Sequence, residues 1–240
     1  MTNTPLRDGV LRLLEAVRNE EWSFERALSD AEREDLGTEQ QPAIKQLVAK
    51  ASAERRAATR ELQKAMAGEV ADDCADPPMT DVGTWTAVQR DAHEAMTELF
   101  DALQRIDEER LAADAGPGRN HPQYAWRDVL NYGVRGPVLA YAEWHHRAGR
   151  TVEALAMLGR WYEAARGSGL PTKVLSDASY DLACGLARAG RLDEAMRYLP
   201  DAFTYNDRGA VPVLKAWARE DPDLAPLAAR PDFRSLVAAT

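Results

Sequence analysis

Residues 124–150 read YAWRDVLNYGVRGPVLAYAEWHHRAGR, and this stretch decides how both halves of the chain are interpreted. Apolar residues recur at steps of three and four, which predicts a helix from about Tyr124 to Ala148. Pro137 lies inside this helix. Because proline lacks an amide hydrogen and clashes with the preceding turn, we expect a bend and a lost backbone hydrogen bond near residue 133. The expected inner face consists of Trp126, Leu130, Gly133, Pro137, Tyr141 and Trp144.

The AGR that ends this stretch, residues 148–150, occurs again at 189–191 within an internal repeat. Each copy predicts a helix, a tight glycine turn and a second helix. Residues 177–203, DASYDLACGLARAGRLDEAMRYLPDAF, resemble a tetratricopeptide repeat, and residues 218–237 resemble the end helices that close such arrays. Two units are few for an independent solenoid, so we expect residues 149–240 to dock on the preceding helices as one continuous helical body.

Three further segments have helical periodicity, and almost nothing alternates with the period of two expected for a strand. The first helix starts at Thr4-Pro5, and Glu21 interrupts its apolar stripe. The second runs from about Pro42 to Gly68 and carries Arg55 on its stripe. Residues 69–81, rich in proline and aspartate, form a linker. A third helix follows, with a stripe from Trp85 to Ile106, so the chain is predicted to be all-α.

Composition and charge exclude several classes of function. The net charge is −9, and residues 1–120 hold 25 acidic against 15 basic side chains, so the surface repels nucleic acid. No stretch has the roughly 20 apolar residues of a membrane span, and no signal peptide is recognised at the N-terminus, which predicts a cytoplasmic protein. Cys74 and Cys184 lack the spacing of a disulfide framework or a thiolate zinc site.

The four predicted helices, the long loop after the second and the run at 124–146 look like the DinB superfamily, and more narrowly its DfsB and colibactin-resistance branch. The features that carry this resemblance are Trp126, Asn131, Gly133 and Gly136-Pro137; the histidine found in that branch is missing. The resemblance implies a DinB-like four-helix bundle over residues 1–148, followed by the tetratricopeptide-like region at 149–240. It also implies a role in self-resistance or secondary metabolism.

Many DinB-like proteins hold a divalent metal with three histidines. Lys50 stands where the first would fall, and Gly136 and Ala140 or Tyr141 stand where the others would. No pair among the four histidines, His93, His121, His145 and His146, has a spacing of three or four that would let two imidazoles converge. We therefore expect a site without a metal, and no cofactor is indicated.

Glu21 and Arg55 are the most informative residues because each places a charge on an apolar stripe. Burying either alone is costly, so each needs a partner, and they could pair with each other. Such a pair could be purely structural, or it could form the polar floor of a cavity. Similarly, Asn131 and Arg135 beside the bend could orient a ligand and stabilise negative charge, or could only satisfy the backbone and the acidic surface.

The sequence thus gives catalytic candidates and ligand-binding candidates within the bundle. The tryptophans could line a ligand pocket or could belong to the core, because aromatic residues at helical spacing are usually core residues. The catalytic candidates are Glu21, Arg55, Asn131 and Arg135, and the binding candidates are Lys50, Trp85, Trp126, Tyr141 and Trp144.

Three functions follow as hypotheses. The first is a metal-independent enzyme or resistance protein that opens or closes the strained ring of a reactive small-molecule metabolite, as the resemblance implies. The second is a protein that binds such a metabolite without turning it over. The third is a helical partner subunit of a larger enzyme complex, which contacts another protein through its repeat-like region.

Overall fold

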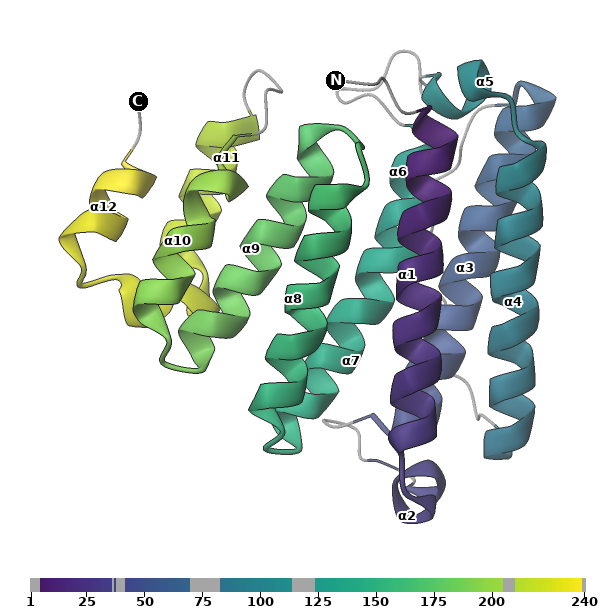
Figure 1. The fold of residues 1–240 in the computed structure, drawn as a ribbon, viewed down its shortest axis with the longest axis horizontal. Helices are drawn as coiled ribbons and strands as arrows, with labels where there is room; N and C mark the ends of the chain where they lie inside the picture. The colour runs from purple at the N-terminus through teal and green to yellow at the C-terminus, as the bar shows by residue number, and fades with distance from the viewer. Residues whose placement is uncertain are drawn as a thin grey trace. The chain divides into compact units, whose positions relative to one another are not determined.

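A computed structural model describes residues 5–35, 37, 42–69, 83–113, 124–204 and 210–238. These residues are almost entirely helical, which confirms the all-α prediction (Figure 1). They fold into two compact units, Met1–Tyr141 and Ala142–Thr240. The boundary lies inside one helix, whereas the sequence placed it after residue 148. Whether the second unit docks on the first stays a prediction, and the predicted linker at 69–81 lies mostly outside the described residues.

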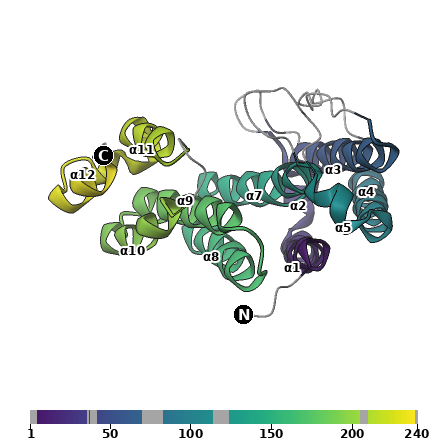
Figure 2. The ribbon, with the colours of Figure 1, turned by 90° about the horizontal axis from the view of Figure 1, so that it is seen from above.

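The first unit is built from α1 (Leu6–Ala27), α3 (Ile44–Ala67), α4 (Trp85–Arg105) and a composite rod. This rod consists of α6 (Ala125–Asp128), the π-helix η1 (Val129–Arg135) and the first part of α7 (Gly136–Arg147). Figures 1 and 2 show α1, α3 and α4 running alongside the rod. Two short helices, α2 (Asp30–Glu34) and α5 (Glu108–Ala112), follow α1 and α4.

The predicted apolar stripes form the core of this unit. Every predicted stripe residue of α1 is buried, Glu21 included, and so is every predicted stripe residue of α4. On α3 the stripe is buried from Ile44 to Leu62, with Arg55 in its middle, whereas Met66 is half-exposed. The helix ends also follow the sequence: Thr84 caps α4 with its side chain, and Gly68 ends α3 with a left-handed φ of 74°.

The composite rod departs from a regular helix where Pro137 predicts it. Residues Val129–Arg135 take π-helical hydrogen bonding, in which the amide of Gly136 reaches the carbonyl of Asn131, five residues back. The rod then returns to α-helix at Gly136, and Pro137 is buried within it. The sequence therefore predicted a disturbed backbone at the right place, although the disturbance is a wider turn over seven residues.

The second unit contains α8 (Thr151–Gly167), α9 (Thr172–Arg188), α10 (Leu192–Ala202), α11 (Ala210–Glu220), the 3-10 helix η2 (Pro222–Leu227) and α12 (Pro231–Val237). Both AGR segments make the same turn. Gly149 and Gly190 each have a φ of 75°, and the following arginine amide bonds the carbonyl five residues back, at 2.9 Å in both copies. The repeat therefore corresponds to two equivalent glycine-capped helix connections.

A glycine sets how closely α8 and α9 pack. A Cβ at Gly185 would lie 2.5 Å from Cδ1 of Leu158 and 3.3 Å from Cδ2 of Leu155. Gly159, on α8, has nothing within 4 Å of such a Cβ. Both glycines therefore lie inside helices, but an added methyl group would clash at Gly185 and would find open space at Gly159.

We expect Gly185→Ala to be less stable than Gly159→Ala by about 1–3 kcal/mol, because both gain the same helix propensity and only the first is overpacked. Urea denaturation of the two variants beside the wild-type chain measures this difference. Equal stabilities would show that Leu158 moves aside without cost.

Candidate functional site

A buried ion pair joins α1 to α3 in the first unit. The Arg55 guanidinium, through Nη2, donates to Oε1 of Glu21. Only 1% of Arg55 and 5% of Glu21 are exposed. The prediction that each charge has a partner, and that the two are partners of each other, is confirmed.

The same guanidinium also holds the irregular backbone of the composite rod. Its Nε donates to the carbonyl oxygen of Gly133 at 3.3 Å. In an α-helix this carbonyl would accept from the amide of residue 137, but Pro137 has no amide hydrogen. Arg55 therefore gives this buried carbonyl a side-chain donor at the point where the backbone changes from π-helix to α-helix and Pro137 offers no amide hydrogen.

The Glu21–Arg55 pair is almost entirely shielded from solvent by the described residues. Arg55 and Tyr141 are each 1% exposed, and Glu21 is 5% exposed. Gly133 contributes to this closure, since a Cβ there would lie 2.8 Å from Cδ2 of Leu99. The pair therefore forms part of the core, and the catalytic role predicted for Glu21 and Arg55 stays a prediction without a described route to solvent.

Burial determines the protonation equilibria of this group. It raises the pKa of Glu21, and the charge of Arg55 opposes that shift only in part. Burial is the largest effect and lowers the pKa of Arg55, but the charge and hydrogen bond of Glu21, together with the neighbouring Tyr141 and Glu25, outweigh it, so the net shift is upward. Burial likewise raises the pKa of Tyr141 well above its usual value. Arg55 thus stays charged, and Tyr141 stays neutral.

A second polar group lies where α3 faces the composite rod. Nζ of Lys50 is 3.4 Å from Oε1 of Glu54. The other carboxylate oxygen, Oε2, would be 3.2 Å from a Cβ at Gly136. Lys50 and Gly136 are two of the positions compared above with family metal ligands. In this structure Glu54 lies between them, paired with Lys50 and close to Gly136. Glu54 was missed because it lies off the apolar stripe.

A pair of carboxyl groups continues this face of α3 toward α6. Glu61 is 5% exposed, and its Oε1 accepts from Nζ of Lys64 at 2.9 Å. Its Oε2 is buried and has no hydrogen-bond partner among the described residues. Burial, and then the charge of Glu61, raises the pKa of Asp128 to about 6. Two carboxyl groups with one unpaired oxygen suit proton transfer near neutral pH.

We call this surface the α3–η1 seam. Asn131, on η1, is exposed, whereas Arg135, the last residue of η1, is half-buried. Both belong to the π-helix, beside the predicted bend. The seam comprises Lys50, Glu54, Glu61, Asp128, Asn131, Arg135 and Gly136.

The predicted aromatic ligands are not gathered at one place. Trp85 is the first residue of α4, whereas Trp126 lies on α6, which contacts the α5 helix that follows the other end of α4. A 21-residue helix is about 30 Å long, so these two tryptophans do not form one wall. Trp144 belongs to the second unit, where Arg150 stacks on its ring at 4.2 Å. Tyr141 packs on Phe24 at a centroid distance of 5.1 Å.

No family model, curated protein or solved structure matches this chain. The likeness to DinB-like proteins is therefore carried by the motifs quoted above. Across the described ranges, no helix is both long enough and apolar enough to cross a bilayer.

Arg55→Met tests the buried ion pair. We expect a loss of about 3–5 kcal/mol in the free energy of unfolding, because the change leaves Glu21 buried without its partner. Combining it with Glu21→Leu should recover most of this loss, except for the part due to the orphaned carbonyl of Gly133, about 1–3 kcal/mol. Chemical denaturation measures all three variants.

Arg56→Met is the matched control. Its partner Asp91 accepts at 2.8 Å, but the two side chains are 31% and 45% exposed, so a loss below about 1 kcal/mol is expected. A similar loss for Arg55→Met and Arg56→Met would contradict the structural role of the buried pair.

Asp128→Asn tests the carboxyl pair through pH. Because folding raises the pKa of Asp128 from 3.8 to about 6, the folded chain binds more protons between these values, so this group favours folding at low pH and opposes it as pH rises through about 6. The wild type should gain more stability than Asp128→Asn between about pH 7.5 and about pH 5. Parallel gains would contradict the shift.

Proposed function

We propose that the first unit binds a small electrophilic metabolite at the α3–η1 seam and opens a strained ring in it. The observation that carries the proposal is the buried Glu61 oxygen without a partner among the described residues, beside Asp128. Titratable groups in such surroundings are typical of acid–base sites. The family resemblance supports the substrate class, since the branch includes a member that acts on a cyclopropane.

The chemistry needs a base, an acid and a positive environment, and no metal ion. A carboxylate of the seam removes a proton from water, the water oxygen bonds to the ring carbon, and the ring carbon–carbon bond breaks. The electron pair passes to an enolate, which a carboxylic acid protonates. Arg135 stabilises the negative charge as it develops, and Asn131 orients the substrate. Lys50 lies eleven residues from Glu61 on α3, about 16 Å away, so it contacts only the far end of the seam.

Glu21 and Arg55 take part indirectly in this proposal. Arg55 holds the carbonyl of Gly133, and η1 carries both Asn131 and Arg135. We infer that the buried pair positions the π-helix, while the groups on the seam contact the substrate. In this proposal Glu21 and Arg55 position the π-helix, whereas Asn131 and Arg135 contact the substrate.

A cyclopropyl ketone with a second electron-withdrawing group serves as the probe. The wild-type chain should accelerate its ring opening, detected by mass spectrometry as the addition of one water. Asp128→Asn and Glu61→Gln should each lower the rate by about 100-fold or more, because general acid–base groups contribute on that scale. Asp101→Asn is the control, since this exposed α4 side chain pairs with Arg105 at 3.5 Å and belongs to no part of the seam.

Each outcome decides between the hypotheses. Binding of the probe by isothermal titration without ring opening would support a sequestering protein. Neither binding nor ring opening would overturn the proposal.

A partner-subunit function is the second candidate, and one observation on the second unit favours it. Trp217 and Val213 of α11 are 65% and 48% exposed, and they lie four residues apart on one helical face. Large apolar side chains exposed together are typical of protein contacts. This function would be preferred if the first unit left the probe untouched.

A further inference from the structure

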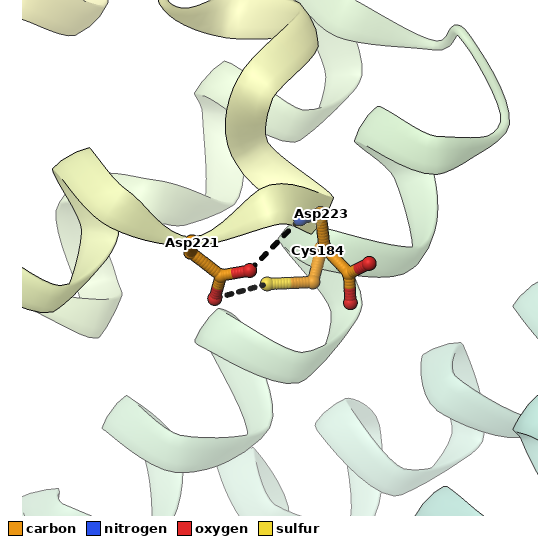
Figure 3. Close-up of side chains that lie close together, drawn as sticks. All are labelled: Cys184, Asp221 and Asp223. Atoms are coloured by element: carbon orange, nitrogen blue, oxygen red, sulfur yellow. Dashed lines mark hydrogen bonds between the residues drawn. The ribbon is translucent and has the colours of Figure 1, made fainter.

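Three metal-ligating side chains converge in the second unit, far along the chain from the seam. Cys184 lies on α9, Asp221 precedes η2, and Asp223 lies in the first turn of η2. One ligand atom from each lies within 4.8 Å of the other two (Figure 3). Sγ of Cys184 is 3.8 Å from Oδ2 of Asp221. The group therefore combines a thiol with two carboxylates, drawn from two elements.

Local hydrogen bonds fix the orientation of Asp221 in this group. Its Oδ1 accepts from the amide of Asp223 at 2.9 Å and so caps η2. Its Oδ2 accepts from the hydroxyl of Tyr180 at 2.7 Å. With both oxygens held, the carboxylate presents Oδ2 to the thiol, so the orientation of Asp221 is already set.

The thiol of Cys184 is buried, so a cation would reach the group from the side of Asp223. Cys184 is 8% exposed, whereas the Asp223 side chain is 40% exposed. Burial, and then the charge of Asp221, raises the pKa of the Cys184 thiol far above its usual value. Without a cation, Cys184 therefore stays a thiol and donates to Asp221. A divalent cation would reverse this preference, because it stabilises the thiolate directly.

A basic residue and a histidine border the group. Nε of Arg188 is 3.5 Å from Oδ1 of Asp223, but this guanidinium also donates to Glu143 through Nη1 at 2.5 Å. His146, which precedes the first AGR turn, is near enough for its charge to act on Asp223. Arg188 can therefore give up Asp223 and keep Glu143. His146 is not among the three groups that already converge, so its side chain has to turn toward Asp223 to contribute a nitrogen.

We propose that Cys184, Asp221 and Asp223 bind one Zn²⁺ ion, with His146 as the fourth ligand. One sulfur, two oxygens and one nitrogen make a tetrahedral set of the kind zinc takes, and the thiolate selects zinc over Mg²⁺ or Ca²⁺. On binding, the thiol proton leaves to solvent as the sulfur–zinc bond forms, while Tyr180 continues to donate to Asp221. The ion ties α9 to η2 and stabilises the second unit independently of the proposed activity.

Cobalt substitution tests this directly. The full-length chain is stripped of metal, titrated with CoCl₂ and followed by absorption, because a thiolate ligand gives cobalt a charge-transfer band in the near ultraviolet. We expect one equivalent to bind with such a band and ZnCl₂ to displace it. Zinc should also raise the melting temperature of the metal-free chain.

Variants assign the ligands. Cys184→Ser should abolish the thiolate band while the metal-free chain keeps its melting temperature, because a serine hydroxyl can still donate to Asp221. Asp223→Asn and His146→Ala should each weaken zinc binding about tenfold or more. Cys74→Ser is the matched control for the other cysteine, and Asp193→Asn is the control for an exposed acid, held by Arg230 at 2.7 Å.

The proposal is overturned if the wild type shows no thiolate band, or if the band survives Cys184→Ser. A band that is lost in Cys74→Ser instead would place the metal elsewhere and equally refute it. A zinc-induced rise in melting temperature that persists in Cys184→Ser would also contradict the assignment.

Discussion

The buried guanidinium of Arg55 is the interaction on which the interior of the first unit depends, because it joins three elements at one point. That point is the buried carbonyl of Gly133 on the π-helix, just before Pro137, which has no amide hydrogen to offer. Arg55 reaches that carbonyl from α3, and its charge in turn requires Glu21 on α1. A single guanidinium thereby links α1, α3 and the composite rod.

This chain of dependence explains why charged residues occupy apolar stripes. An apolar side chain at position 55 would pack as well but would leave the Gly133 carbonyl unsatisfied. A buried arginine without Glu21 would carry an uncompensated charge. The ion pair and the irregular backbone are therefore linked through one side chain, which also contributes to holding α3 against η1.

The sequence predicted the fold well because burial and periodicity are local signals. The stripes of α1 and α4 and both AGR turns need only residues within one helix or one turn, and all appear as expected. The partnership of Glu21 with Arg55 was predictable for a similar reason, since two opposite buried charges need each other. The π-helix was predictable in place but not in type, because proline specifies a lost bond and not how the neighbouring carbonyls are satisfied.

The candidate sites depend instead on contacts between helices, which no periodicity contains. Glu54 and Glu61 look like surface acids in the sequence, and only the packing of α3 against the rod buries them. Cys184 and Asp221 are 37 residues apart, so no spacing motif joins them. A charged residue on an apolar stripe is conspicuous in the sequence, but its side chain can be fully used in structural hydrogen bonds, as that of Arg55 is. Glu61 is an inconspicuous acid that packing has buried, and one of its oxygens has no partner among the described residues, so chemistry is better sought there.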